Sequence, residues 1–129
     1  MGLGAGWKED EFTAYDYEFP AIRERLERLR ETGKICRAMF TDERADFEGR
    51  YYRVSQAINE PKPIQTGGPP IWIGSQGEKV GLRIVAEVAD GWNHNRGRGA
   101  FDRKLGLLHE HCRDLGRDPS TMRVSVERS

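Results

Sequence analysis

The chain lacks a net charge, because 21 Lys and Arg residues balance 21 Asp and Glu residues. No overall electric field therefore draws it to nucleic acid or to an anionic membrane surface. No apolar run approaches the roughly 20 residues that a membrane span requires, and no leader of basic and then apolar residues precedes a cleavage site. These absences predict a cytoplasmic protein with neither nucleic acid nor a membrane as its partner.

Several chemical motifs are missing as well. The sequence has no G-x-S-x-G elbow, no H-E-x-x-H, no paired C-x-x-C and no Walker-type loop, so hydrolase, zinc and nucleoside triphosphatase functions have no support. His109 and His111 lie two apart on a predicted helix and point in different directions, which excludes a facing metal pair. We expect both at the surface and no metal site. Cys36 and Cys112 fall on the apolar sides of predicted helices, which predicts free thiols.

The residues that are present alternate between two periodicities. Apolar side chains recur at steps of three and four over residues 20–40, 78–88 and 101–115, which predicts three helices with solvated, charged backs. Short strand-like segments precede, separate and follow these helices, and they lie near residues 2–7, 71–73, 89–93 and 123–127. The order predicts an α/β fold of parallel βα units in a single domain spanning residues 1–129.

Residues 41–70 interrupt this alternation. A glycine turn followed by aromatic residues, at 46–54, predicts a small hairpin outside the main sheet. Residues 59–70 carry four of the six prolines together with Gly67 and Gly68, which predicts an extended connector into the next strand. We therefore expect a loop and hairpin insertion near 41–70.

The most informative stretch runs from Pro69 to Lys79, where a short apolar strand enters a glycine-rich turn and then a helix. Ser75 and Glu78 match the S-x-x-E capping box, which predicts a helix that begins there with its first N–H groups free. A phosphate is the natural partner, because free N–H groups and the positive end of the helix dipole act at the same point. The alternative is a tight turn whose glycines serve packing alone, and the pattern leaves both open.

Five segments together carry a family resemblance: Gly2–Trp7, Phe47–Tyr52, Pro61–Gln65, Pro69–Gly74 and Ala89–Asn93. In this order and at this spacing, the chain resembles the bacterial luciferase-like monooxygenase superfamily over nearly its whole length. It is most similar to the oxidoreductases that use a hydroxy-deazaflavin coenzyme instead of FMN. The resemblance implies a (β/α)8 TIM barrel, of which this chain would hold about strands four to seven with their helices.

The resemblance also implies a cofactor site at the carboxyl ends of the strands. Gly74, Ser75, Gln76 and Gly77 would contact the phosphate side of the cofactor, and Gly6 and Trp7 would lie near its ring. The cofactor would be an 8-hydroxy-5-deazaflavin coenzyme of the F-420 type, or FMN. In the family, much of the substrate pocket and a strained peptide bond under the ring come from earlier strands, which this chain does not match.

Three further side chains are considered individually. His94 follows a strand and is a candidate general acid or base, although a single loop histidine is more often a plain surface residue. Trp92 ends a strand, where it could border a ring or simply fill the core. Arg128 leaves the last strand at the same edge and is considered as a contact of a phosphate or of a polyglutamate tail.

Two functions follow from these expectations. The first is an oxidoreductase that transfers hydride between a reduced flavin or deazaflavin and a small organic substrate. The second is a non-catalytic half-barrel that acts only by association, either with itself as a homo-oligomer or with a chain that supplies the missing strands, because open strand edges invite pairing.

Overall fold

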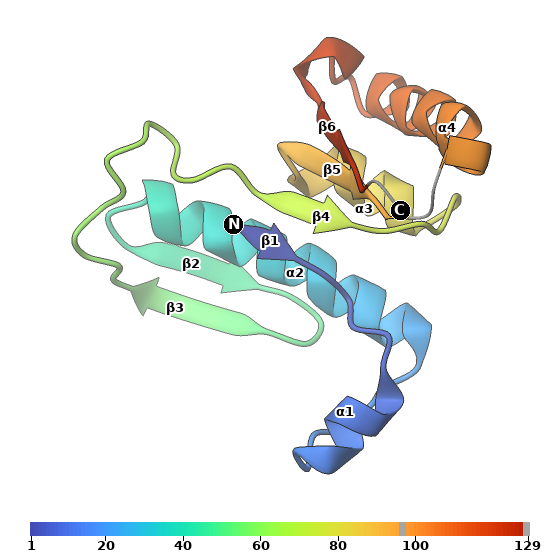
Figure 1. Cartoon of the computed structure of the whole chain (residues 1–129). Coiled ribbons are helices and arrows are strands. Elements are labelled where there is room, and N and C mark those ends of the chain that lie inside the picture. Colours follow the sequence, from blue (N-terminus) through green and yellow to red (C-terminus); the bar gives the residue numbers. More distant parts are fainter. Residues whose placement is uncertain (96–97, 128–129) are drawn as a thin grey trace.

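The computed structural model describes residues 1–95 and 98–127, and it confirms the predicted parallel α/β arrangement (Figure 1). Its main sheet has the order β1-β4-β5-β6, with every neighbouring pair parallel. The strands are β1 (Gly2–Leu3), β4 (Trp72–Gly74), β5 (Gly91–His94) and β6 (Arg123–Val126). The helices are α1 (Glu9–Ala14), α2 (Ile22–Thr41), α3 (Gly81–Val88) and α4 (Phe101–Asp114), with short 3-10 turns at Arg98–Ala100 and Pro119–Thr121.

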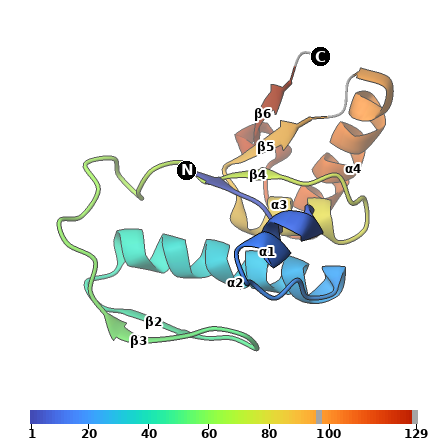
Figure 2. The ribbon, with the colours of Figure 1, turned by 60° about the horizontal axis from the view of Figure 1, so that its bottom comes forward.

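Helices α2, α3 and α4 cover one face of this sheet, and Figure 2 shows α2 and α3 together on that side. The core lies there, because Ile71, Ile73 and Trp92 from the strands are fully buried with apolar residues of α2, α3 and α4. Neighbouring residues on a strand point to opposite faces. Trp72 and Asn93 therefore face the other side of the sheet, where they border a shallow hollow of about 330 Å³.

No described helix or strand covers this second face. Parallel sheets are normally covered on both faces, as in closed βα barrels. Trp72 and Gly91 lie opposite each other in register, and a side chain at residue 91 would meet the Trp72 ring at 2.5 Å. The bare face is thus shaped by small residues around one tryptophan.

The predicted hairpin is confirmed as a separate antiparallel sheet of β2 (Ala45–Glu48) and β3 (Arg53–Ala57). It packs beside α2 (Figure 1) through an unexpected residue, Glu31, whose exposed fraction is only 3%. The Glu31 carboxylate accepts hydrogen bonds from the backbone N–H groups of Arg50 at 2.5 Å, Tyr51 at 3.1 Å and Tyr52 at 2.8 Å. The helical periodicity of the sequence does not mark Glu31 for this buried contact.

The predicted capping box is also wrong. Helix α3 begins at Gly81 after Val80, which makes no side-chain cap, and residues 78–80 form a turn. The Glu78 carboxylate instead forms a hydrogen-bonded ion pair with Arg103. The backbone carbonyl oxygen of Glu78 lies 2.8 Å from Nε2 of His111. Glu78, which the local pattern assigned to the helix cap, therefore contacts α4 instead.

The expectations for the two cysteines and for the connector over residues 59–70 are confirmed. Both cysteines are free thiols, Cys36 half-buried and Cys112 buried, and burial raises the pKa of each above its ordinary value. Gly116 follows α4 with a φ of +72°, the left-handed conformation that favours glycine at a helix end. Residues 59–70 form no helix or strand.

Asp90, directly before β5, ties the sheet to α2. Its Oδ2 atom accepts hydrogen bonds from the backbone N–H of Ile71 at 2.7 Å and from the guanidinium of Arg37 at 2.8 Å. Burial by itself would raise the pKa of Asp90, but the Ile71 hydrogen bond and the Arg37 cation outweigh it and lower that pKa below its ordinary value of 3.8. The unfolded chain therefore binds this proton more readily than the folded one.

We expect Asp90→Asn to lower the free energy of unfolding by about 1 kcal/mol at neutral pH. The carboxylate stabilises the folded protein above its unfolded pKa, and this contribution is lost as the pH falls through the lower, folded pKa. The difference between wild type and variant should thus shrink below about pH 4. Urea unfolding at neutral and at acidic pH measures it, with exposed Asp114→Asn as the control. A pH-independent difference would contradict the assignment.

Candidate functional site

A cleft of about 530 Å³ lies at the carboxyl ends of β1 and β4. Parallel strands bring their carboxyl ends to one edge of the sheet, where ligands of open α/β sheets bind. The cleft is bordered by segments 4–7 and 74–77, together with Ile22 and Leu26 of α2, and by Gly81 and Asn95. All six residues predicted to contact a cofactor line it: Gly6, Trp7, Gly74, Ser75, Gln76 and Gly77.

The turn after β4 presents free hydrogen-bond donors. The backbone N–H groups of Gln76 and Gly77 donate to no described residue, whereas the Ser75 N–H faces the Asn93 carbonyl in the β4–β5 ladder. The turn leads into α3, an eight-residue helix whose N-terminal end is the positive end of its dipole. A Cβ atom at Gly81, the first helical residue, would overlap the Ser75 hydroxyl oxygen. Only glycine at residue 81 therefore lets the Ser75 hydroxyl rest at the helix start.

The Gln76 side chain is a second sign that this turn meets a polar partner. Both its amide nitrogen and its amide oxygen are shielded from solvent, and neither hydrogen-bonds to a described residue. Buried polar groups in native proteins are nearly always paired, since leaving one unpaired costs about 1 to 3 kcal/mol. The residues present therefore fit a phosphate and its hydroxyl-bearing chain, which offer both acceptors and donors.

The opposite wall of the cleft comes from the chain that leaves β1. Gly6 has a φ of +78°, and a Cβ atom there would lie 2.7 Å from the Phe12 ring, so a larger residue would displace that ring. The Trp7 side chain has an exposed fraction of 82%. An exposed indole beside a cleft is available to cover a flat ring, whereas the alternative of a core tryptophan is excluded at this position.

His94 lies elsewhere. It is the last residue of β5 and is fully buried, with its ring centroid 5.2 Å from Trp92 and 5.5 Å from Phe101. The interpretation as a surface loop histidine is therefore wrong. His94 is also absent from the described residues that line the cleft, so its position lends no support to a role as general acid or base there.

Trp92, which the sequence left undecided, is a core residue that also reaches the turn. Its ring is fully buried and stacks on Phe101 at an interplanar angle of 3°. Its indole N–H donates to the carbonyl oxygen of Ser75 at 2.8 Å. Trp92 pairs in register with Ile73, and both side chains point into the core. The sequence does not reveal this register.

The remaining sequence candidates have varied outcomes. The expectation that both helix histidines lie at the surface is wrong, since His109 and His111 are half-buried. Among the described residues, no three His, Cys, Asp or Glu side chains gather as metal ligands. Within the same part of the chain, no helix has the length and apolar character to cross a bilayer. Arg128 lies outside the described residues.

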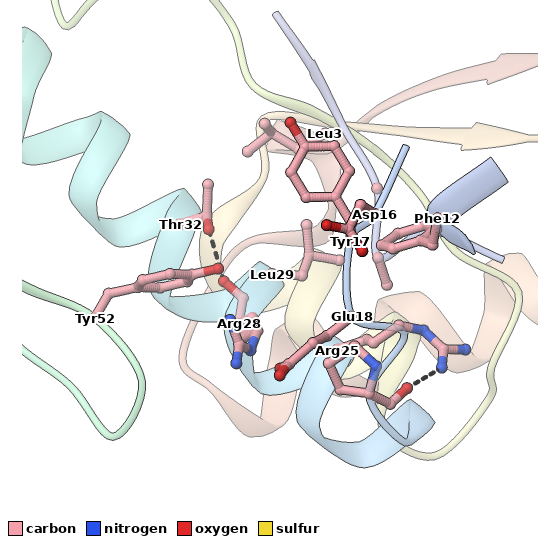
Figure 3. Close-up of a pocket in the computed structure, with 13 residues that line it drawn as sticks. Leu3, Phe12, Asp16, Tyr17, Glu18, Arg25, Arg28, Leu29, Thr32 and Tyr52 are labelled. Carbon is pink, nitrogen blue, oxygen red and sulfur yellow. Dashed lines mark hydrogen bonds between the residues drawn. The ribbon is translucent and has the colours of Figure 1, made fainter. Parts of the chain in front are cut away.

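The structure contains a second cavity of about 530 Å³ that was not predicted from the sequence (Figure 3). It lies on the other side of residues 4–5 and is bordered by α2, the segment after α1 and Tyr52 of the hairpin tip. Both arginines that line it have partners within α2 or beside it, because Arg25 donates to the Pro20 carbonyl and Arg28 pairs with Glu24 at 2.6 Å. Only Nε of Arg25 is buried without a hydrogen-bond partner among the described side-chain atoms of this cavity.

The fold and the cleft together define a parallel βα protein with a glycine-rich turn and unengaged backbone N–H groups at the carboxyl edge of its sheet. The model of the luciferase-like monooxygenase family matches residues 1–129, and the chain belongs to that family. The family predicted from the sequence is thus confirmed.

Curated relatives and solved structures agree. The F420-dependent glucose-6-phosphate dehydrogenase of Nocardia farcinica is 38% identical over 98% of this chain, and that of Mycolicibacterium gilvum is 30% identical over 98%. This chain spans 38% of the length of both. An F420-dependent secondary alcohol dehydrogenase, solved with an F420-acetone adduct, superposes with a TM-score of 0.83 at 23% identity, covering 97% of this chain and 38% of its own.

A further solved neighbour is the coenzyme F420-dependent tetrahydromethanopterin reductase of Methanopyrus kandleri. It has a TM-score of 0.81 at 21% identity, and the match covers 97% of this chain and 39% of that chain. At such identities the likeness establishes the fold. The matched lengths show that this chain corresponds to a part of its relatives.

Proposed function

We propose that this chain forms the phosphate-binding side of the cofactor site in a luciferase-like barrel. The complete barrel would transfer hydride between a reduced F420-type deazaflavin, or FMN, and a small organic substrate. The observation that carries the proposal is the single cleft in which Gly6, Trp7 and the turn 74–77 meet. The names of the relatives support the F420-type cofactor first, since several are F420-dependent oxidoreductases.

Each part of the cleft has a distinct task in this proposal. The bound cofactor supplies the redox chemistry. The N–H groups of Gln76 and Gly77 bind its phosphate, the Ser75 hydroxyl adds a donor beside them, and Trp7 covers the ring and excludes water. Holding both ends of the cofactor in this way fixes the ring relative to the substrate, which is how a protein raises the rate of a bimolecular step.

The position of the chain within the barrel is part of the proposal. We assign β1, β4, β5 and β6 to strands four to seven, with residues 1–129 as one partial domain and 41–70 as its insertion. The early strands of the barrel would then provide the rest of the ring site and most of the substrate pocket. A cytoplasmic location fits this function.

A second function is favoured by the bare face of the sheet. Trp72 and Asn93 lie on a face that no described element covers, and β1 and β6 have unpaired outer edges. Such edges pair readily with other chains. The chain could therefore act by association, as a half-barrel that joins a second copy or a complementary half. Analytical ultracentrifugation separates the two functions, because a stable monomer that binds cofactor speaks against the association function.

The cofactor assignment predicts a difference between two ligands that share one ring. Titration with FMN should shift the NMR signals of the Ser75, Gln76 and Gly77 amides, whereas riboflavin, which lacks the phosphate, should leave them in place. An F420 titration should act like FMN. The physical reason is that the free N–H groups in the turn before α3 recognise the phosphate and not the ring.

The comparison of FMN with riboflavin is decisive because only the phosphate differs. Equal shifts with both ligands would place the ring, and not the phosphate, at the turn. Amide signals that stay unchanged at millimolar FMN would remove the phosphate assignment altogether.

A further inference from the structure

The turn after β4 is held by its carbonyl groups. Four consecutive carbonyl oxygens, those of residues 75–78, each accept a hydrogen bond from a group outside the turn. The pairs are Trp92 Nε1 to Ser75 O at 2.8 Å, Lys104 Nζ to Gln76 O at 2.6 Å, the Leu82 N–H to Gly77 O at 2.8 Å, and His111 Nε2 to Glu78 O at 2.8 Å. Three of these donors are side chains, and all three come from β5 or α4.

Fixing the carbonyls also fixes the N–H groups. In a planar trans peptide the C=O of one residue and the N–H of the next point in opposite directions. The carbonyls of Ser75 and Gln76 point toward Trp92 and Lys104, so the N–H groups of Gln76 and Gly77 point away from them. These are the N–H groups that donate to no described residue and whose residues line the cleft.

Lys104 adds charge as well as a hydrogen bond. Its ammonium group forms no ion pair with a described carboxylate, so its charge is uncompensated beside the Gln76 carbonyl. A hydrogen bond from a cation is roughly twice as strong as one between neutral groups. The same cation makes the local potential favourable for an anion at the turn.

We propose that Trp92, Lys104 and His111 are positioning residues for the phosphate site. They hold the carbonyls of the turn on the α4 side, so that the N–H groups of Gln76 and Gly77 converge on the phosphate in the cleft, and Lys104 supplies positive charge behind them. This inference rests on the proposed function for the identity of the anion. Its first test needs no ligand.

The test compares variants that remove a donor with variants that retain one. Lys104→Met keeps the length of the side chain without its donor, and Lys104→Arg keeps a cationic donor. His111→Leu and His111→Gln form a second pair on the same helix, and Trp92→Phe removes the indole N–H but keeps an aromatic ring. If one variant fails to fold, the remaining variants still test whether these side chains hold the turn.

The first measurement is the backbone NMR order parameter of residues 75–78 in the ligand-free protein. We expect it to fall from about 0.85, typical of rigid backbone, to below about 0.6 in Lys104→Met, and to return in Lys104→Arg. His111→Leu and His111→Gln should differ in the same direction at Glu78. The second measurement is the FMN dissociation constant from amide shifts, which should rise about tenfold in Lys104→Met, since disorder of a binding loop weakens binding.

The outcomes separate this inference from the proposed function. Unchanged order parameters in Lys104→Met, His111→Leu and Trp92→Phe would overturn the positioning role whether or not FMN binds. A disordered turn that still binds FMN with wild-type affinity would also overturn it, because the side chains would then serve the fold alone. If the wild-type turn is ordered but its amide signals do not respond to FMN, the phosphate assignment is refuted. The order parameters of the ligand-free variants then still decide whether the side chains hold the turn.

Discussion

Replacing Glu31 with alanine is expected to lower the free energy of unfolding by about 3 kcal/mol. Each buried backbone donor that loses its partner costs about 1 to 3 kcal/mol, and hydrogen bonds to water can offset only part of that cost. The carboxylate accepts from three consecutive backbone N–H groups, at Arg50, Tyr51 and Tyr52. It joins the hairpin tip to α2, together with the Arg28 guanidinium, which lies over the rings of Tyr51 and Tyr52. Urea unfolding measures the loss, and the hairpin signals in NMR spectra should broaden or move.

Two matched variants define the cause. Glu27→Ala lies on the same helix and removes only a surface pair with Arg30 at 3.1 Å, so it should change stability by less than about 1 kcal/mol. Glu31→Gln keeps one acceptor oxygen but turns an amide N–H toward backbone donors, and its effect should lie between the two. A loss in Glu31→Ala no larger than that in Glu27→Ala would show that the tip does not depend on this carboxylate.

Glu31 also shows where prediction from sequence stops. The helix over 22–41 was predictable, because its apolar residues repeat with the helical period and no proline interrupts them. The same period places Glu31 among charges that are mostly solvated. Its partners are backbone groups of a turn 19 to 21 residues further on, and no local pattern marks a contact of that kind. A tertiary contact therefore overrode a sound local rule.

The predicted start of α3 was wrong for a related reason. The S-x-x-E pattern predicts a cap from Ser75 and Glu78, but a capping box contributes only about 1 kcal/mol. Arg103 and His111 on α4 offer Glu78 a side-chain and a backbone contact instead. Both donors lie more than twenty residues away in the chain, and both sit in a helix whose sequence shows only helical periodicity. The strand, the turn and the free N–H groups were predictable, whereas their anchoring was not.

The candidate site divides in the same way. Segment 74–77 was predicted from a strand, glycines and a helix start that lie next to each other in the sequence. Gly6 and Trp7 came from the family resemblance, and the parallel pairing of β1 with β4 brings them to the same edge. His94 was placed one residue too late, in a loop instead of at the end of β5. Because side chains alternate along a strand, extending the strand to residue 94 puts the His94 side chain on the same buried face as Trp92.

Gly74→Val is expected to weaken FMN binding by about 100-fold, or roughly 2.7 kcal/mol, while leaving the fold intact. A Cβ atom at Gly74 meets no heavy atom within 4 Å, so the added side chain projects into open space. That space is where the cleft joins the hollow of the bare face, since Gly74 borders both. Valine suits a strand, and its methyl groups would occupy the path between the phosphate turn and the ring wall.

The matched control is Gly106→Val, because a Cβ atom at Gly106 also meets nothing within 4 Å but lies on α4, outside the cleft. Both variants should give wild-type circular dichroism, and only Gly74→Val should raise the FMN dissociation constant. Ser75→Ala combined with Gly74→Val should weaken binding further, because it also removes the hydroxyl at the start of α3. Wild-type affinity in a folded Gly74→Val protein would mean that the cofactor does not pass through this cleft, and the phosphate would have to bind elsewhere on the sheet edge.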